Sequence, residues 1–561
     1  MKKSFGIVLF LVLFGWTSAA PAADKSPVKP QDPDKTSAKP PVWDVYWQWE
    51  GDRLPPILKL TLTNPLDTPI ELSHWRLTGK NAGEFNFMDG KCPADTTLEP
   101  AKSVVLRLVW NRKKAPGRKF QAAVHFNHNR PETKLADRIN LRQAAAHLPH
   151  CYTMPGFLAR QGKPVPRDKQ GHIILDDGYH DGPMIEKLLT AFAKDYPQLA
   201  TLHELGTTWQ GRKILGLRIT SHVKKDREKP AFLFVAAHHA SELLSTEMVL
   251  DTINRLTSEY ATDPEVRRWV DNYEIWCVPL ANPDGLNKFF HVNCGGRKNG
   301  RDSNQNGRID LAEGVDLNRN YPYRWHSLGE KGSSGDPRHG RYRGPSAGSE
   351  PETKAIMRLA DRERFVMLIT YHTAGTRVLV PYTIDKARNP HPDVAWMVGA
   401  AMAALSDGVR KNRDYMPVRC LYSVDGVDQD WHYWRYGTLA YLLEGPATTP
   451  PPDDRKKMIL GARPSWEYMM RRLATGPTLS GHVVDRTTGK PLEAVVSIDE
   501  IKTFEQERHT SHPDSGRFDR VLPIEGTYHL RVEKDGYRTE VVEVKVGHEW
   551  KKIDVALSPE K

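Results

Sequence analysis

Two histidines and two glutamates follow three apolar stretches in this 561-residue chain. They are His239 and Glu242 after residues 231–237, His372 after residues 365–370, and Glu444 after residues 439–443. Unbroken apolar stretches of this length are typical of strands buried on both faces of a sheet, and ligands bind at the carboxyl ends of such strands. Two imidazoles and one carboxylate are the protein ligands of a hydrolytic zinc site with water in the fourth place, and Glu444 is then a candidate base for that water.

Each of these residues has a simpler explanation when it is considered alone. A single histidine is more often a surface group or a satisfied core group, and a glutamate at a strand end is often a cap or a salt-bridge partner. The spacing of His239 and Glu242 also occurs by chance in many proteins. Because the simpler explanations require a coincidence at three strand ends, the pattern favours the metal site.

The sequence around these residues, from about residue 151 to residue 476, alternates between helix and strand patterns. Two predicted helices, the first starting at Pro183, carry their apolar residues at helical spacing. These residues are Ile185, Leu188, Leu189 and Phe192 in the first helix, and Val249, Ile253 and Leu256 in the second. Apolar strands that alternate with amphipathic helices predict an α/β domain.

The segments on both sides of this domain are predicted to be β-structures. Residues 42–145 contain alternating leucines at positions 58, 60 and 62 and a second β-rich run at residues 103–110. The stretch "LTGKNAGEFNF", followed by Cys92, resembles the Ig-like β-sandwich modules of exported bacterial proteins. After residue 476, short strand patterns are separated by glycine turns, which predicts a second small β-sandwich over residues 476–561.

The N-terminus predicts export. Lys2 and Lys3 precede an uncharged run over residues 5–16 and a group of small residues, which is the pattern of a secretory signal peptide over residues 1–23. Residues 24–41 hold five prolines among charged residues and predict an extended linker. No other run is long enough to span a bilayer, so we expect a periplasmic or secreted protein without a transmembrane segment after signal removal.

Composition narrows the classes of partner. The net charge of +11 comes from 80 Lys+Arg and 69 Asp+Glu, which is a mild bias for this length. No block rich in lysine and arginine is present, so nucleic acid is not an expected partner. Five cysteines are few and odd in number, so they predict no disulfide framework and no particular pairing. The sequence predicts no oligomeric state.

Six short motifs occur in one order between residues 206 and 446. They are "GTTWQGRKILGLRI", "HASE", "VPLANPDG", "GVDLNRNYP", "YHTAGTRVLVPY" and "LLEGP". Together they closely resemble the zinc metallocarboxypeptidases of the carboxypeptidase A type. "DLNRNYP", "DQDW" and the β-rich segment that follows are closer to the carboxypeptidase N/E branch, whose members carry a transthyretin-like domain there. The resemblance implies a mixed-sheet zinc carboxypeptidase domain over residues 150–475 and a transthyretin-like domain over residues 476–561.

Position by position, the resemblance implies that His239, Glu242 and His372 bind one zinc ion. His238 is a rival for the first position, but only His239 has the family's two-residue gap to Glu242. Asp316 matches the carboxylate that orients the first histidine ligand.

Other matched positions imply catalytic roles or contacts with the substrate. Glu444 matches the general base that activates the zinc-bound water and passes the proton to the leaving amine. Asn318 and Arg319 match the pair that holds the terminal carboxylate, to which a guanidinium donates two parallel hydrogen bonds. Arg297 matches the arginine that polarises the carbonyl of the cleaved bond, and Arg301 is a rival because an insertion shifts the local pattern.

The substrate pocket departs from the family pattern at two positions. Tyr422 matches the mobile tyrosine that closes over the substrate, and Gln429 matches the family's "QDW". Ser241 stands where many members carry an arginine, and Thr383 stands where basic-selective members carry an acid. Without that acidic residue, a preference for substrates that end in Lys or Arg is less expected, unless another carboxylate of this chain takes its place. The candidates are Asp385, Asp425 and Asp428.

A calcium site is predicted between Arg297 and Asn318. The segment "DSNQNGRIDLAE" has an oxygen ligand at every ligand position of an EF-hand loop and Gly307 at the sixth position. The ligands are Asp302, Asn304, Asn306, the backbone carbonyl of Arg308, Asp310 and Glu313. The alternative is a surface loop rich in asparagine and glycine. A calcium ion here would have a structural role, because the insertion joins Arg297 to the carboxylate-binding pair.

The resulting expectation is an exported zinc carboxypeptidase that acts on the C-termini of peptides or proteins. A first alternative is a peptidase of the same fold that cuts the stem peptides of the cell wall, whose ends are also carboxylates. A second alternative is an inactive adhesion or binding module that uses the two β-domains. The complete set of ligands, base and carboxylate clamp argues against loss of activity.

Overall fold

The computed structural model describes residues 43–50, 57–88, 93–110, 121–141, 164–175, 178–221, 229–290, 295–307, 309, 312–409 and 414–560. The predicted signal peptide and linker lie outside these residues, as do Cys92, Cys151 and Cys294. The two described cysteines, Cys277 and Cys420, are both free. Among the described residues, no helix is both long enough and apolar enough to cross a membrane.

The N-terminal β-domain consists of short strands in two sheets. In the described part, one sheet has the order β1-β2-β6-β4 and the other β5-β3-β7-β8. The strands are β1 (Asp44–Glu50), β2 (Ile57–Thr63), β3 (Ile70–Thr78), β4 (Phe85–Phe87), β5 (Thr96–Leu98), β6 (Ser103–Trp110), β7 (Ala123–His128) and β8 (Arg138–Asn140). Leu58, Leu60 and Leu62 are buried, as their alternation predicts. The likeness to Ig-like modules stays a prediction.

The central domain is built on one mixed sheet, which confirms the predicted α/β class. Its described strands have the order β15-β14-β16-β13-β11-β12-β10-β9. They are β9 (Ala200–Thr207), β10 (Lys213–Ile219), β11 (Ala231–Ala236), β12 (Glu274–Val278), β13 (Met367–Thr373), β14 (Arg377–Leu379), β15 (Met416–Val418) and β16 (Leu439–Gly445). The neighbours β12, β11, β13 and β16 run parallel at the centre, and every residue of β11 and β13 is buried.

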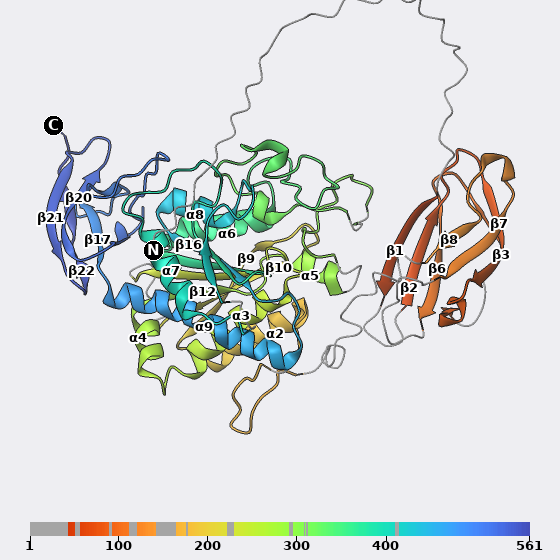
Figure 1. Cartoon of the computed structure of the whole chain (residues 1–561), viewed down its shortest axis with the longest axis horizontal. Coiled ribbons are helices and arrows are strands. Elements are labelled where there is room, and N and C mark those ends of the chain that lie inside the picture. The colour runs from red at the N-terminus through yellow and green to blue at the C-terminus, as the bar shows by residue number, and fades with distance from the viewer. Residues whose placement is uncertain are drawn as a thin grey trace, which may run out of the picture.

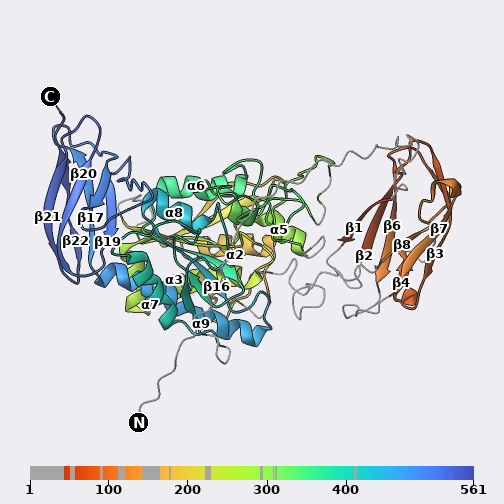
Figure 2. The same cartoon turned by 45° about the horizontal axis from the view of Figure 1, so that its top comes forward.

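Helices cover both faces of this sheet. They are α2 (Gly182–Asp195), α3 (Leu243–Ser258), α4 (Pro264–Asn272), α5 (Pro283–Lys288), α6 (Pro351–Glu363), α7 (Val394–Leu405), α8 (Asp428–Tyr436) and α9 (Pro452–Thr475). Figures 1 and 2 show α3, α7 and α9 on one side of the sheet and α6 and α8 on the other. The predicted apolar face of α2 is buried, and the side chain of Asp181 caps its first turn by accepting a hydrogen bond from the backbone N–H of Met184.

The predicted ends of two strands were too early. β13 and β16 continue through His372 and Glu444, which pair with each other in parallel register instead of following the strands. The β-branched and aromatic residues Thr370, Tyr371 and Thr373 favour this continuation. The two side chains therefore stand on rigid backbone at the carboxyl edge of the sheet.

The C-terminal β-domain packs directly on the central domain, beside α7 and α8 in Figures 1 and 2. Its described strands form one sheet around β17, with β19, β22 and β23, and another with the order β18-β20-β21. They are β17 (Thr478–Asp485), β18 (Val495–Ile498), β19 (Arg517–Val521), β20 (Gly526–Glu533), β21 (Glu540–Val546), β22 (Trp550–Lys552) and β23 (Val555–Leu557). The likeness to transthyretin-like domains stays a prediction.

Candidate active site

A tight turn between β11 and α3 presents the first two candidate ligands. Ala237 adopts a left-handed conformation with a φ of 60°, which turns the chain out of the strand. The backbone N–H of Ala240 donates to the carbonyl of Gly296 at 2.7 Å and ties the turn to the neighbouring loop. Glu242 immediately precedes α3, so His239 and Glu242 are both fixed between a buried strand and a buried helix.

The three candidate ligands converge at one point, which we call the cradle. The Nδ1 atoms of His239 and His372 lie 3.2 Å apart, and each faces a carboxylate oxygen of Glu242, at 2.9 Å and 3.1 Å. All three ligand atoms lie within 4.8 Å of one another, and among the described residues this is the only such group of histidine, cysteine and acidic side chains. Two nitrogens and a carboxylate that face each other at these distances fit a zinc ion.

Asp316 and Arg297 support His239 from the other side. Nε2 of His239 donates to Oδ1 of Asp316 at 3.0 Å, which leaves the lone pair of Nδ1 for the cradle. Arg297 donates to Oδ2 of Asp316 at 2.6 Å and also approaches Nδ1 of His239 at 3.2 Å. Burial alone would raise the pKa of Asp316, but Arg297 and His239 hold it well below its usual range, so Asp316 stays ionised.

His238, the rival of His239, turns away from the cradle. Its Nε2 is hydrogen-bonded to the hydroxyl of Tyr321 at 2.9 Å and its Nδ1 to Thr370 at 3.3 Å. Its ring stacks on His372 at 5.8 Å between centroids, so His238 contributes packing beneath the candidate ligand. Burial lowers the pKa of His238 to about 4, which keeps the ring neutral at pH 7.

Glu444 lies beside the cradle with one free oxygen. Its Oε2 is buried and has no hydrogen-bond partner in the described part of the chain. Burial, together with the nearby carboxylate of Glu242, raises the pKa of Glu444 to about 7. Gly375 makes room for it, because a Cβ at that position would lie 3.2 Å from the Cβ of Glu444. A carboxylate in this state can take up and release a proton near neutral pH.

Asn318 and Arg319 belong to a single 3₁₀ turn, Leu317–Arg319, which Asp316 caps by accepting from the N–H of Asn318 at 3.1 Å. The Arg319 side chain is buried, its Nε has no partner among the described residues, and NH1 donates to the backbone carbonyl of Asn318 at 2.5 Å. Within the described part of the chain, no carboxylate forms an ion pair with Arg319. Gly426 allows the close packing here, because a Cβ there would lie 2.6 Å from the carbonyl oxygen of Arg319.

One small cavity connects these groups. It is lined by His239, Asn318, Arg319, His372, Leu379, Thr383, Leu421, Tyr422, Val424, Val427, Gln429, Leu442 and Glu444. The ring of Tyr422 is half exposed at its rim, 6.0 Å from the guanidinium carbon of Arg319. Two of the three predicted ligands, the predicted base, the carboxylate pair, the tyrosine and the pocket glutamine therefore share one space. Glu242 and Arg297 are not among the described residues that line it.

Thr383 and Gln429 give this cavity a neutral polar lining. The buried carboxylate of Asp430, which is not among the described lining residues, accepts from the hydroxyl of Thr383 at 3.1 Å. Nε2 of Gln429 donates to the hydroxyl of Thr383 at 2.9 Å, and Oε1 of Gln429 is buried with no partner in the residues that the structure describes. None of the three carboxylates considered as substitutes lines the cavity among the described residues. Asp385 is exposed, Asp425 accepts from the backbone N–H of Leu328 and from the hydroxyl of Ser333, and Asp428 faces His238 and His432.

Arg301 lies elsewhere than Arg297. It forms an ion pair with Glu350 at 2.9 Å and its guanidinium covers the ring of Trp209 at 4.9 Å. Of the two rivals, only Arg297 contacts the cradle.

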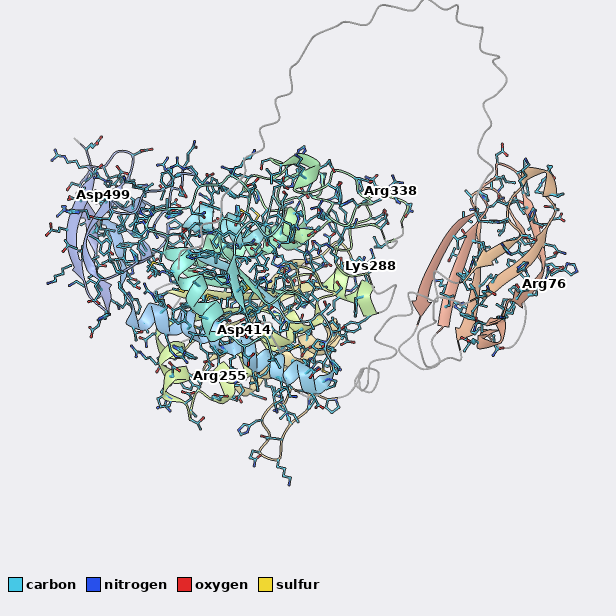
Figure 3. The ribbon with its side chains drawn as sticks, in the orientation of Figure 1. Arg76, Arg255, Lys288, Arg338, Asp414 and Asp499 are labelled. Carbon is cyan, nitrogen blue, oxygen red and sulfur yellow. The ribbon has the colours of Figure 1, made fainter. Side chains whose placement is uncertain are left out.

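The predicted calcium loop is only partly described, because Arg308 and Asp310 lie outside the described residues. Three of the remaining candidate ligands turn their side-chain oxygens inward onto the loop's own backbone. Asp302 accepts from Gly307 N–H at 2.7 Å, Asn304 accepts from Asn306 N–H at 3.0 Å, and Glu313 accepts from Asn304 N–H at 3.2 Å. Lys288 at the end of α5, labelled in Figure 3, donates to the backbone carbonyl of Glu313 at 3.1 Å.

Sequence reasoning missed several residues that build this site. Asn282 caps α5 by accepting from Gly285 N–H and holds the ligand turn by donating to the carbonyl of His238. His432 forms a buried pair at 2.8 Å with Asp428, one turn earlier on α8, which the sequence suggested only as a pocket carboxylate and which lies 3.8 Å from Nε2 of His238. The i, i+4 spacing of Asp428 and His432 was a visible signal, whereas the contact of Asn282 joins segments 44 residues apart.

Comparison with known proteins gives one family. The family model for zinc carboxypeptidases matches residues 185–463. A zinc carboxypeptidase of Saccharothrix mutabilis subsp. capreolus is 34% identical over 152 residues, which is 27% of this chain and 34% of that protein. Carboxypeptidase D of Mus musculus is 25% identical over 428 residues, 71% of this chain and 28% of that protein. The chain therefore spans about a third of the length of these relatives.

Two further similarities complete the comparison. A metallocarboxypeptidase A-like protein of Trichophyton verrucosum is 30% identical over 261 residues, 45% of this chain and 59% of that protein. Among solved structures, carboxypeptidase A from Helicoverpa armigera is 21% identical with a TM-score of 0.48, covering 72% of this chain and 95% of that one.

Proposed function

The central domain of this chain belongs to the zinc carboxypeptidase family, and from this premise we propose that the protein removes single C-terminal residues from peptides or proteins. The proposed zinc ligands are His239, Glu242 and His372, and the proposed general base is Glu444. Zinc would act as a Lewis acid that polarises the peptide carbonyl and activates water. Glu444 would take the proton from that water and pass it to the leaving amine, for which a pKa near neutrality is suited.

The observation that carries this proposal is the state of Arg319. Asp316 and Glu444 interact electrostatically with Arg319, but no described carboxylate forms an ion pair with it. A buried arginine without an ion-pair partner is costly, so such a group is expected where an anion binds. Arg319 lines the same cavity as His239 and His372 of the cradle and as Glu444. A terminal carboxylate on Arg319 and Asn318 would place the last peptide bond of the substrate at the cradle, which favours a carboxypeptidase over an endopeptidase.

Arg297 and Tyr422 would act on the other side of the cleaved bond. The guanidinium of Arg297 already lies at the cradle through Asp316 and is in reach of a carbonyl oxygen bound there. Tyr422 stands at the rim next to Arg319 and would cover a bound substrate. These roles rest on matched positions and on their geometry around the cradle.

We propose that the side-chain pocket takes uncharged residues. Its walls are Leu379, Val424, Val427 and Leu442, and its polar groups are those of Thr383 and Gln429. A lysine or arginine side chain would enter without a carboxylate to pair with, which is unfavourable in a buried place. The free Oε1 of Gln429 can accept one hydrogen bond from a neutral donor.

The test is mass spectrometry of a mixed peptide pool after incubation with the protein, with and without 1,10-phenanthroline. The expected result is chelator-sensitive loss of single C-terminal residues, fastest for apolar ones, while peptides with amidated C-termini stay intact. Internal cleavage would contradict the proposal. Absence of trimming with zinc bound would also contradict it, and trimming of peptidoglycan stem peptides alone would favour the cell-wall alternative.

We also propose a structural calcium ion in the loop from Asp302 to Glu313. The support is the inward orientation of Asp302, Asn304 and Glu313 and the left-handed φ of 77° at Gly307, the position that requires a sharp turn. Isothermal titration of the zinc-loaded protein with calcium tests it, and Asp302→Asn should weaken the binding. Absence of a calcium-dependent heat would contradict the site.

Export and the identity of the flanking domains are proposals from the sequence pattern. We propose that residues 1–23 are removed as a signal peptide, and that an Ig-like and a transthyretin-like domain flank the catalytic domain over residues 42–145 and 476–561. N-terminal sequencing of protein recovered from the periplasm or the medium tests the first part. A mature chain that retains residues 1–23 would contradict it.

A further inference from the structure

A loop of the C-terminal β-domain reaches back to the central domain. It comprises residues 499–511 between β18 and β19 and begins at Asp499, which is labelled in Figure 3. The backbones of Lys502 and His391 exchange two hydrogen bonds of 2.9 Å each. Next to this pair, the guanidinium of Arg388 covers the ring of Phe504 at 3.8 Å. The loop is therefore docked by backbone as well as side-chain contacts.

Glu505 in this loop contacts three separate segments of the central domain. Its Oε2 accepts from the hydroxyl of Tyr323 at 3.0 Å and from the guanidinium of Arg324. Its Oε1 accepts from the backbone N–H of Arg388 at 2.9 Å. Its backbone carbonyl accepts from Nε1 of Trp434 at 3.0 Å. The carboxylate is 9% exposed, so water competes little for these bonds.

Each contacted segment carries one residue of the substrate cavity. Tyr323 and Arg324 follow Arg319 by four and five residues, Arg388 follows Thr383 by five residues, and Trp434 lies on the same helix as Gln429. Arg319, Thr383 and Gln429 all line the cavity. One residue from outside the central domain, through its carboxylate and its backbone carbonyl, thus links the carriers of the carboxylate clamp and of the side-chain pocket.

A second carboxylate and a group of aromatic rings strengthen this link. Oε1 of Glu507 accepts from the hydroxyl of Tyr382 at 2.9 Å, and its Oε2 accepts from the N–H of Glu505 at 2.8 Å. Tyr382 stacks on Tyr323 at 5.1 Å, and Tyr323 stacks on Trp434 at 5.4 Å. Tyr382 directly precedes Thr383, and the packed aromatic rings are nearly rigid. Displacement of the loop would therefore shift Tyr382 and, with it, Thr383 in the pocket.

We propose that Glu505 is a positioning residue of the substrate cavity, by which the C-terminal β-domain sets the distance between the carboxylate clamp and the side-chain pocket. The inference rests on the proposed function for what the cavity binds, but not for its geometry. Its contacts join residues 181, 117 and 71 positions apart in sequence, so no local structure replaces them. Misplacement of the clamp relative to the pocket weakens binding of the substrate's end more than the chemistry at the cradle.

The experiment compares Glu505→Ala and Glu505→Gln with a matched control, Glu493→Gln, in the full-length zinc-loaded protein. Glu493 also joins the two domains, through Arg364 at 3.0 Å, but contacts nothing in the cavity. The measurements are KM and kcat on a peptide that the wild type trims, and hydrogen exchange of the backbone amides of residues 382–384 without substrate. Those of Thr383 and Ile384 donate to Asp430, so their protection reports the position of this segment.

For Glu505→Ala we expect KM to rise about tenfold with kcat within about twofold of the wild type, and faster exchange at residues 382–384. Glu505→Gln should give a smaller change in the same direction, because one of its two acceptors remains, and it serves if the alanine variant does not fold. The control should change neither quantity. A fall in kcat at constant KM, an equal effect of Glu493→Gln, or unchanged exchange would overturn the inference.

The exchange measurement separates this inference from the proposed function. If the wild type trims no peptide, the proposed function fails. The hydrogen-exchange pattern alone then tests the positioning role of Glu505. Faster exchange at residues 382–384 in the Glu505 variants but not in Glu493→Gln would then still support the positioning role. Equal exchange in all proteins would overturn it.

Discussion

Replacement of Arg319 by methionine isolates the group that we propose to bind the substrate's carboxylate. Methionine is close in length to the arginine stem and can fill the same buried space without a charge. Among the described residues, the side chain of Arg319 makes one hydrogen bond, to the carbonyl of Asn318, and has no ion-pair partner. Because a buried charge without a partner costs free energy, Arg319→Met should fold at least as stably as the wild type.

The effect on catalysis follows from the bonds that a carboxylate would make. A hydrogen bond to a charged group contributes about 1.5–3 kcal/mol, so two parallel bonds to the guanidinium contribute about 3–6 kcal/mol. Each 1.4 kcal/mol is a factor of ten, so kcat/KM should fall by about 10²–10⁴.

The assay is a cycle of two enzymes and two substrates: wild type and Arg319→Met, each with a peptide and with its C-terminally amidated copy. The wild type should discriminate between the two peptides by about 10²–10⁴ in kcat/KM, and the variant by less than about threefold, because the discriminating charge is gone. Zinc content and thermal unfolding of both proteins are measured alongside.

Two results would refute this reasoning. A variant that still prefers the free carboxylate by more than about tenfold would place the carboxylate on another residue. A variant that unfolds at a clearly lower temperature with a normal zinc content would mean that Arg319 stabilises the resting protein.

Three further perturbations test other parts of the site. Glu444 must lose its proton to act as a base. Its pKa is raised to about 7 in the metal-free site, and a bound zinc ion would lower that pKa. The value of kcat/KM should therefore rise with pH, and the midpoint of this rise should lie at or below pH 7. Glu444→Gln should remove this activity while zinc binding persists; a rate that falls as pH rises through this range would contradict the assignment. Asp316→Asn, which weakens the acceptor of His239 Nε2, should lower zinc affinity about 10–100-fold in a competition titration with a chromogenic chelator. Removal of calcium with zinc retained should raise KM, and unchanged kinetics in calcium-free enzyme would argue against a role for the loop from Asp302 to Glu313 in the site.

The local parts of this structure were predictable from sequence. Hydrophobic periodicity predicted the strands of the central sheet, the apolar face of α2 and the alternating leucines of β2. Each of these burial patterns depends only on the residues of one helix or strand. The convergence of His239, Glu242 and His372 followed from parallel strands whose carboxyl ends share one edge. The strand ends were less predictable, because His372 and Glu444 extend β13 and β16 through cross-strand pairing that only the folded sheet supplies.

The contacts that fix the site are mostly long-range and left little signal. Arg297 and Arg301 lie four residues apart in the sequence. Only the folded structure shows that Arg297 forms an ion pair with Asp316 and Arg301 with Glu350. The contacts of Glu505 could not be predicted, because its partners lie in three segments of another domain.

The neutral polar lining of the cavity at Thr383 and Gln429 affects where digestion of a peptide stops. An enzyme that removes one residue at a time exposes a new C-terminal side chain after every cycle. Thr383 and Gln429 are neutral and offer no ion-pair partner to a charged side chain of either sign. Trimming should then proceed through apolar residues and stop at the first charged one. The products should be a series of peptides, each one residue shorter than the last, and the position of the first charged residue sets the shortest product.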